Sequence, residues 1–280
     1  MELDCLSIKK EANNIRKDAY RIARIAGGGH LAGACSSAEL LATLYFGDVL
    51  RYDANKPQWN ERDLFILSKG HVCFALYAVL LHAGFFSAEV LNGICQPGSE
   101  FGGHPKIGIP GVEASTGSLG HGLSFGIGNA LVMKRKNCDR HVYVLMGDGE
   151  CDEGSVWEAA LSAPTLNLDN LTLIIDANGL QGMGKTDSIV SLEPFTEKWR
   201  TFGWNAIEID GHDPQAIQEA LLQRVVNTPT AVIARTIKGK GASFMENRAI
   251  WHFRMPDADE TKILLDELDI SEDAVDTIGG

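Results

Sequence analysis

The chain has 280 residues, of which 45% are hydrophobic and 22% are charged, and these proportions are ordinary for a soluble globular protein. Its formal net charge of −12 argues against nucleic acid or an anionic membrane as the main partner. No apolar run approaches the length of about 18 residues that suggests a membrane-spanning helix, and the six cysteines have no zinc-ligand spacing. We therefore expect reduced cysteines, a cytoplasmic location and one domain over residues 1–280.

The amino-terminal stretch predicts two helices. Apolar residues recur at helical spacing over residues 7–26, and the three glycines at 27–29 are expected to end that helix just before His30. Ser36 and Glu39 match a capping box, which predicts that a second helix begins at this point.

A first strand and two further helices are expected in the next part of the chain. The apolar run at 64–67 predicts the strand, and the sequence Ser-Lys-Gly-His at 68–71 follows it. An apolar helix is expected over 72–82. Residues 95–118 are rich in loop-forming residues, and after them a helix of small residues is expected to end near residue 134.

A βαβ unit is predicted at the centre of the chain. The apolar run at 142–146 predicts a strand that stops at the turn Gly-Asp-Gly of 147–149, where glycine lets a ligand approach the backbone. A helix over 155–163 and a second buried strand over 171–175 follow, and the sequence Asp-Ala-Asn occupies 176–178. Each strand is thus followed by a polar residue at its carboxyl end, where ligands bind in open parallel sheets.

The remaining chain continues the alternation of helices and strands. We expect a loop over 181–188, helices over 195–202 and 213–226, strands over 206–209 and 231–234, a loop over 236–255, and then a polar helix and an acidic tail. About five or more short strands separated by helices predict an α/β fold with a parallel sheet flanked by helices. A Rossmann dinucleotide-binding fold is the alternative, but no G-x-G-x-x-G sequence joins a strand to a helix.

The polar residues at the two strand ends suit a magnesium-bound diphosphate. Asp148 supplies a carboxylate, and Asn178 supplies an amide oxygen 30 residues further on. Mg²⁺ prefers hard oxygen ligands, usually takes one or two protein carboxylates, and shares its remaining positions with phosphate oxygens and water. The unit is therefore able to hold a metal-bound diphosphate.

These residues resemble the thiamine diphosphate signature, which is Gly-Asp-Gly, about thirty residues, and then Asn. The segment Glu153-Gly154 with Trp157-Glu158-Ala159 is similar to the transketolase version of the signature, and acyl-transferring relatives usually lack that Trp. Nearly the whole chain resembles the amino-terminal half of a transketolase. The resemblance implies the thiamine diphosphate-binding fold, with a single diphosphate-binding domain in this chain.

The resemblance also implies the ligands of the cofactor and its metal. The metal would be held by the side chains of Asp148 and Asn178 and by the backbone carbonyl of Leu180, and it would be Mg²⁺, Ca²⁺ or Mn²⁺. Gly149 would approach the diphosphate of thiamine diphosphate. Glu153 would lie at the contact between subunits, although a Glu at the start of a helix is also favoured by the helix dipole.

Five of the eight histidines directly follow a glycine. By resemblance, His30, His104 and His252 face the substrate as catalytic residues, and His71 and His252 lie beside the cofactor. The sequence Gly117-Ser118-Leu119-Gly120 matches a motif whose backbone and Leu pack on the cofactor, with Ser118 in place of a common Pro. The role of His121 stays open, and His82, His141 and His212 are expected to be structural.

Two further features bear on the substrate. Phe253 stands where the family commonly has Gly, and it is expected to narrow the pocket. Lys238 and Lys240, in the glycine-rich run 238–241, either meet a phosphate or belong to a solvated loop, and the sequence does not decide between these alternatives.

The resemblance implies a partner. The family uses a catalytic Glu on a pyrimidine-binding domain to activate thiamine diphosphate, and this domain and the arginines that grip the sugar phosphate are not found in this chain. We therefore expect a split transketolase that acts on small sugars or sugar phosphates, with a second, C-terminal subunit that carries the pyrimidine domain, in an α₂β₂ assembly. A thiamine diphosphate enzyme of the acyl-transfer type and a non-catalytic cofactor-binding module are the alternatives.

Overall fold

The computed structural model describes residues 3–182 and 184–279, and its centre is a five-stranded parallel sheet. The strand order is β1-β2-β3-β7-β6, and every neighbouring pair is parallel. The bounds are β1 Leu64–Leu67, β2 Val142–Gly147, β3 Leu171–Ala177, β6 Asn205–Asp210 and β7 Thr230–Arg235. The predicted α/β fold with a parallel sheet is confirmed, and each strand lies where the apolar runs placed it.

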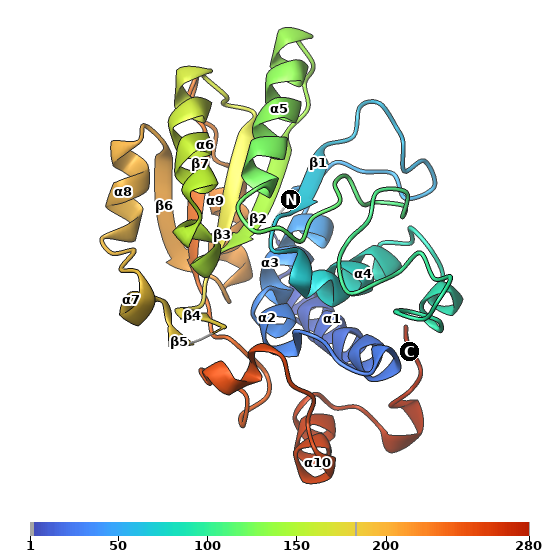
Figure 1. The fold of residues 1–280 in the computed structure, drawn as a ribbon. Helices are drawn as coiled ribbons and strands as arrows, with labels where there is room; N and C mark the ends of the chain where they lie inside the picture. The colour runs from blue at the N-terminus through green and yellow to red at the C-terminus, as the bar shows by residue number, and fades with distance from the viewer. Residues whose placement is uncertain (1–2, 183, 280) are drawn as a thin grey trace.

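Helices cover both faces of this sheet (Figure 1). Side chains on one face of the strands pack in a core with α1 (Cys5–Ala26), α3 (Ala38–Phe46), α4 (Cys73–His82) and α9 (Pro214–Leu222). Side chains on the other face pack with α5 (Gly122–Arg135), α6 (Gly154–Thr165) and α8 (Phe195–Thr201). Burial on both faces explains why the strands read as continuous apolar runs instead of alternating patterns.

The amino-terminal helix is confirmed, but the capping box is not. Helix α1 begins at Cys5, two residues early, because the Asp4 side chain accepts a hydrogen bond from the Ser7 N–H and caps it. The Ser36 side chain caps no helix, and its hydroxyl donates to Asp176 across the molecule. Ser36 instead ends an unpredicted short helix, α2 (Leu31–Ser36), so the expected helix start at this residue is wrong.

Two expectations in the second half need correction. The helix predicted over 213–226 ends at Leu222, and a β-bridge between Val225 and Thr228 follows it. The expected loop over 181–188 contains regular secondary structure. Strand β4 (Leu180–Gln181) pairs with β5 (Gly184–Lys185), and α7 (Thr186–Ile189) follows. Residue 183 lies outside the described part of the chain.

Single turns and a last helix complete the described structure. The turns are η1 (Gly70–Val72), η2 (Ala88–Leu91), η3 (Gly149–Asp152), η4 (Ala249–His252) and η5 (Glu272–Ala274), and the polar helix is α10 (Ala258–Glu267). Across the described residues, no helix has the length and apolar character that crossing a bilayer requires.

The sheet register brings the site residues to one edge. Gly147 pairs with Asp176, and Ala177 pairs with Arg235, so β2, β3 and β7 end side by side. In Figure 1 the strands point toward the region that holds α2 and β4. The segments that follow the strands therefore converge there, as the rule for ligand sites in parallel sheets leads one to expect.

Helix α5 provides a test of how tightly the sheet is covered. A Cβ added at Gly126 would lie 2.5 Å from Cγ2 of Val144, whereas a Cβ at Gly128 would meet nothing within 4 Å. We expect Gly126→Ala to lower the free energy of unfolding by about 1 to 2 kcal/mol, because overpacking outweighs the gain in helix propensity. Gly128→Ala, the control, is expected to raise it by about 0.5 kcal/mol or more. Urea denaturation measures both, and equal stability of the two variants would contradict the packing.

Candidate functional site

Most of the residues that the sequence singled out converge on one pocket. Its volume is about 160 Å³, and it lies at the carboxyl edge of the sheet. It is lined by His30, Lys69, His71, Leu119, Asp148, Gly149, Glu150, Asn178, Leu180, Lys238 and His252, among others. A larger hollow of about 580 Å³ lies at the opposite edge, beside residues that precede the strands, and it contains none of the predicted site residues. We place the site in the smaller pocket because the predicted metal ligands and most of the predicted histidines line it.

Asp148 is a buried carboxylate of this pocket. It follows β2, is 4% exposed, and accepts hydrogen bonds from the N–H of Gly149 at 2.8 Å and of Gly179 at 2.6 Å. Burial, together with the nearby Asp176 carboxylate, raises the pKa of Asp148 to about 6. A cation at this carboxylate would remove the penalty of burying its charge.

The other two expected metal ligands lie beside Asp148. The amide oxygen of Asn178 accepts from the Leu180 N–H at 3.1 Å, and its Nδ2 lies 3.5 Å from Asp176 Oδ1, so the amide has a defined orientation. The Leu180 carbonyl accepts from Lys238 Nζ at 3.4 Å. One carboxylate, one amide oxygen and one carbonyl form a hard oxygen set that fits a divalent ion completed by phosphate and water.

No cluster of three or more His, Cys, Asp or Glu side chains able to hold a metal occurs in residues 3–182 and 184–279. The expected metal ligands include a single carboxylate, so the absence of such a cluster does not contradict them. A metal at this place would depend on ligands from phosphate oxygens, which is the way Mg²⁺ is usually bound with nucleotides and diphosphates. The metal assignment therefore stays a prediction.

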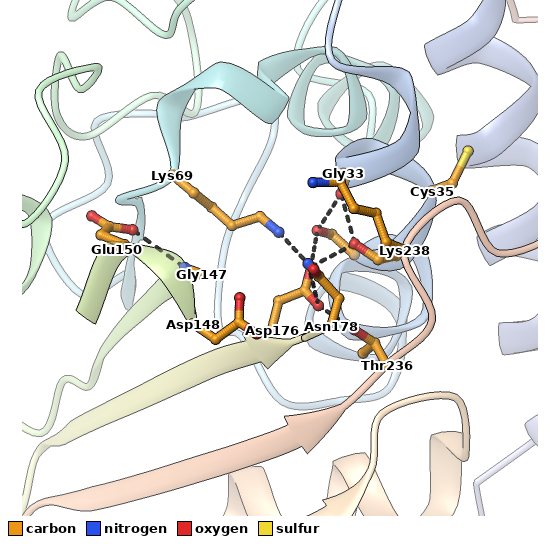
Figure 2. A network of polar contacts seen from close by, with 12 residues as sticks. Gly33, Cys35, Lys69, Gly147, Asp148, Glu150, Asp176, Asn178, Thr236 and Lys238 are labelled. Carbon is orange, nitrogen blue, oxygen red and sulfur yellow. Dashed lines mark hydrogen bonds and ion pairs between the residues drawn. The ribbon is translucent and has the colours of Figure 1, made fainter. Parts of the chain in front are cut away.

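Asp176 is the centre of the polar network that forms the floor of the pocket (Figure 2). It is fully buried, and it accepts hydrogen bonds from Lys69 Nζ, from the hydroxyls of Ser36 at 2.6 Å and Ser37 at 3.2 Å, and from Thr236 Oγ1. Burial opposes its ionisation, but the Lys69 ammonium and the hydrogen bonds outweigh it and hold the pKa of Asp176 below its ordinary value. One carboxylate thus joins α2, the β1 loop, β3 and the β7 loop.

Lysine side chains bring positive charge to the same pocket. Lys69 is 2% exposed and Lys238 is 3% exposed, and both line the pocket. Burial and the neighbouring Lys69 ammonium lower the pKa of Lys238 to about 8. The sequence left two alternatives for Lys238 and Lys240, a contact with phosphate or a solvated loop. Lys238 is buried in the pocket and is therefore not solvated. Lys240 lies outside the pocket and forms an ion pair with Glu246 at 3.7 Å.

Lys69 and Asp176 were missed as site residues, although both were visible in the sequence. Each is a charged residue near the carboxyl end of an apolar run, and such a residue is buried only when it is paired. Lys69 lies within the Ser-Lys-Gly-His motif of 68–71, and Asp176 lies two positions before Asn178. The signal was therefore present, but the pairing depends on the sheet register.

Three histidine rings form the wall of the pocket. The His30 ring centroid lies 4.9 Å from that of His71 and 5.0 Å from that of His252, and the latter two are 5.8 Å apart. Burial lowers the pKa of His30 to about 4 and that of His71 to about 2, and burial with the Lys238 ammonium lowers the pKa of His252. All three imidazoles are therefore neutral at pH 7 and able both to donate and to accept.

The loop before α5 reaches the pocket through one residue. Leu119 lines the pocket, whereas Gly117 and Ser118 are exposed. His104 is also exposed, and its ring packs on Gly117, where an added Cβ would lie 3.0 Å from His104 Cδ2. His121 Nδ1 lies 3.2 Å from the carbonyl oxygens of Ser118 and Leu119, a local contact within the same loop.

The turn after β2 contributes Gly149 but not Glu153. Gly149 lines the pocket, and a Cβ there would lie 2.8 Å from Cβ of Gln181, so glycine permits this close approach. Glu153 is exposed and immediately precedes α6, as expected for a residue at a helix start. Its predicted place at a contact between subunits remains a prediction.

Phe253 lies beside the histidine wall. Its ring centroid is 4.9 Å from that of His30, in an edge contact, and the residue is 64% exposed. The large side chain thus stands next to a predicted substrate-facing histidine, on the surface.

The remaining histidines have structural partners, as predicted. His82 bonds to Asp18 at 2.7 Å, and His141 Nε2 lies 2.8 Å from the Thr172 hydroxyl. His212 bonds to Glu39 at 2.9 Å and accepts from a backbone N–H at 2.8 Å.

Comparison with known proteins gives a consistent result. Residues 7–274 match the family model described as transketolase, thiamine diphosphate binding domain. The chain is 42% identical to one of the subunits of the apulose-4-phosphate transketolase of Phocaeicola vulgatus, over 93% of this chain and 92% of that protein. It is 40% identical to the 6-deoxy-6-sulfo-D-fructose transketolase subunit SqwG of a Clostridium species, over 88% of this chain and 90% of that protein.

Longer transketolases match over part of their length. Human transketolase is 37% identical over 88% of this chain but only 39% of its own length. The crystal structure of transketolase from Campylobacter jejuni superimposes with a TM-score of 0.89 at 30% identity, over 97% of this chain and 44% of that chain. The chain therefore spans less than half of these proteins.

The buried ion pair under the pocket predicts a stability effect. Lys69→Met would leave the Asp176 carboxylate buried without its counter-ion and is expected to lower the free energy of unfolding by about 3 to 5 kcal/mol. Adding Asp176→Asn removes the unpaired charge and should restore part of the loss. Lys136→Met, at an exposed position, serves as the control and should change little. Urea denaturation measures the free energy of unfolding of each variant. A double variant no more stable than Lys69→Met would contradict the proposed cost of the unpaired Asp176 carboxylate.

Proposed function

This chain belongs to the family of transketolase thiamine diphosphate binding domains, and from that premise we propose that it is the amino-terminal subunit of a two-component transketolase. One observation carries the proposal: the chain covers 92% of a relative that is named as a single subunit of a transketolase, but only 39% of human transketolase. On this proposal residues 1–280 are one diphosphate-binding domain, and a second chain carries the pyrimidine-binding domain in an α₂β₂ assembly.

We infer that the pocket holds thiamine diphosphate with a divalent metal such as Mg²⁺. Asp148, Asn178 and the Leu180 carbonyl would bind the metal, because they are hard oxygen donors that line the pocket side by side. The ammonium groups of Lys69 and Lys238 would neutralise the diphosphate charge. When bound, the cofactor supplies a thiazolium that stabilises the carbanion formed from the donor.

The histidines of the wall would form hydrogen bonds with the substrate hydroxyls and exchange protons with them. His252 Nδ1 lies 3.3 Å from Lys238 Nζ, and since an ammonium only donates, this nitrogen accepts and leaves Nε2–H to donate. His30 is neutral and able to take a proton from a hydroxyl as a general base. His104 is exposed and packs on Gly117 outside the pocket, and from there it would contact the far part of a sugar.

The reaction would move a two-carbon ketol unit from a ketose or ketose phosphate to an aldehyde. The two relatives named as subunits are assigned different sugars, apulose 4-phosphate and 6-deoxy-6-sulfo-D-fructose, so relatedness does not specify the donor. The acid that protonates the cofactor ring would come from the partner. Among the described residues, the side chains that line the pocket include two carboxylates, Asp148 and Glu150, and both already accept hydrogen bonds within the chain.

Ketol transfer with a general donor tests the proposal. Hydroxypyruvate releases the same two-carbon unit on loss of CO₂, and glycolaldehyde is a simple acceptor. With thiamine diphosphate and Mg²⁺, we expect formation of the four-carbon ketose only when this chain is mixed with the chain encoded beside it. Activity of this chain alone would overturn the proposed dependence on a partner, and transfer from pyruvate but not hydroxypyruvate would favour the acyl-transfer class.

The raised pKa of Asp148 predicts a pH dependence of metal binding. Only the ionised carboxylate binds a divalent ion, so the affinity for Mg²⁺ should fall about tenfold per pH unit below its pKa of about 6. The stability of the metal-free chain changes in the opposite direction: because the folded pKa of Asp148 is raised above its ordinary value of 3.8, stability is lost as pH rises from there to about 6, and Mg²⁺ should reverse the loss. Calorimetry of Mg²⁺-dependent cofactor binding at pH 5 and 7 checks this.

The matched variants are Asp148→Ala and Asp187→Ala. Asp148→Ala should abolish the Mg²⁺ dependence of cofactor binding, whereas Asp187→Ala, at an exposed position on α7, should behave as the wild type. Full Mg²⁺-dependent affinity in Asp148→Ala would rule out this residue as a metal ligand.

A further inference from the structure

Glu150 is a buried carboxylate in the pocket to which no role has yet been assigned. It is 3% exposed and lies two residues after Asp148. Its Oε1 accepts from the Ser68 hydroxyl and from the Gly120 N–H at 2.8 Å, and its Oε2 accepts from the Gly147 N–H at 3.2 Å. Figure 2 shows it beside Gly147 at the end of β2. Three segments far apart in the sequence thus meet at one carboxylate.

The three hydrogen-bond partners of Glu150 all act as donors. The Ser68 hydroxyl oxygen accepts from the Gly122 N–H at 3.1 Å, so its own hydrogen is directed to Glu150. The other two partners of Glu150 are backbone N–H groups, which only donate. All three partners are therefore donors, and a carboxylate satisfies them, whereas an amide would turn its NH₂ group toward at least one of them.

Each of the three segments carries a different part of the pocket. Ser68 precedes the segment with Lys69 and His71, Gly120 follows Leu119, and Gly147 precedes Asp148 and Gly149. The glycines make the close approach possible.

The packing around these segments leaves little room for other arrangements. A Cβ at Gly122 would lie 2.3 Å from Ser68 Oγ, and a Cβ at Gly120 would lie 2.5 Å from Ser155 Oγ. The hydrogen bonds of Glu150 thus connect segments that are already tightly packed. A small shift of one of these segments would move the pocket residues that it carries.

We propose that Glu150 is a positioning residue that sets the relative places of the Lys69, Leu119 and Asp148 segments and so preforms the diphosphate-binding cleft. The identity of the ligand rests on the proposed function. Both oxygens of Glu150 are engaged within the protein, so it acts through the three segments and not by direct contact with the ligand. The alternative is a brace that adds stability but leaves ligand affinity unchanged.

The test compares Glu150→Gln, Ser68→Ala and their double variant with Glu61→Gln, a control at an exposed position in the loop before β1. Calorimetry gives the Kd for thiamine diphosphate with Mg²⁺, for the chain and for its mixture with the partner, well below the Tm of each variant. We expect Glu150→Gln to raise Kd at least tenfold and Ser68→Ala to raise it severalfold. The double variant should raise Kd by less than the product of the two single effects, because the two substitutions share the hydrogen bond between Ser68 and Glu150.

Two readouts separate positioning from mere stability. Hydrogen exchange in the ligand-free chain should become faster at residues 117–120 and 147–149 in Glu150→Gln. With cofactor saturating, the KM for the sugar donor should stay within about twofold of the wild type, because the substrate-facing His30 and His252 lie on segments that Glu150 does not contact. A lower Tm with unchanged Kd and unchanged exchange would overturn the proposal.

The outcomes also distinguish this inference from the proposed function. A wild-type chain that binds no thiamine diphosphate would contradict the proposed function, and the exchange experiment would still decide on Glu150. If Glu150→Gln does not fold, Ser68→Ala carries the same test, since it removes one of the three donors. An unchanged Kd and unchanged exchange in Ser68→Ala would then overturn the proposal.

Discussion

The buried ion pair between Lys69 and Asp176 is the constraint on which the rest of the site depends. Asp176 is fully buried, and it remains ionised there only because an ammonium and three hydroxyls surround it. Those groups come from α2, from the loop after β1 and from the loop after β7, so satisfying one carboxylate fixes three segments at the sheet edge. The floor of the pocket is therefore preformed in the ligand-free chain, which reduces the ordering that ligand binding would require.

The charges of the pocket divide it into two regions. Its floor combines the cations Lys69 and Lys238 with the carboxylate of Asp148, and a ligand that carries both a diphosphate and a divalent metal would complement both signs. Its wall consists of imidazoles whose pKa values are lowered by burial, so they are neutral hydrogen-bonding groups. This division suits a reaction in which a charged cofactor is held at the floor and the hydroxyls of a sugar are handled at the wall.

The sequence predicted much of the fold, because apolar runs between helical patterns report burial on both faces of a parallel sheet. It also placed Asp148 and Asn178 together, since the carboxyl ends of adjacent parallel strands meet at one edge. The hydrogen-bond partners of Asp176 and Glu150 were not predictable, because they come from segments distant in the sequence. Ser36, for example, matched a capping box locally, yet its hydroxyl donates to Asp176. The substrate-facing roles of His30, His104 and His252 came from resemblance alone, and the structure groups only His30 and His252 in one wall with His71.

The central claim is that this sheet edge binds a metal-bound diphosphate. Calorimetric titration of the chain with thiamine diphosphate and with thiamine, each with and without Mg²⁺, tests it most directly. The account predicts binding of thiamine diphosphate that requires Mg²⁺ and an affinity for thiamine at least a hundredfold weaker, because thiamine offers nothing to Lys69, Lys238 or the metal. Equal affinity for both compounds, or binding of thiamine diphosphate that is indifferent to Mg²⁺, would contradict it.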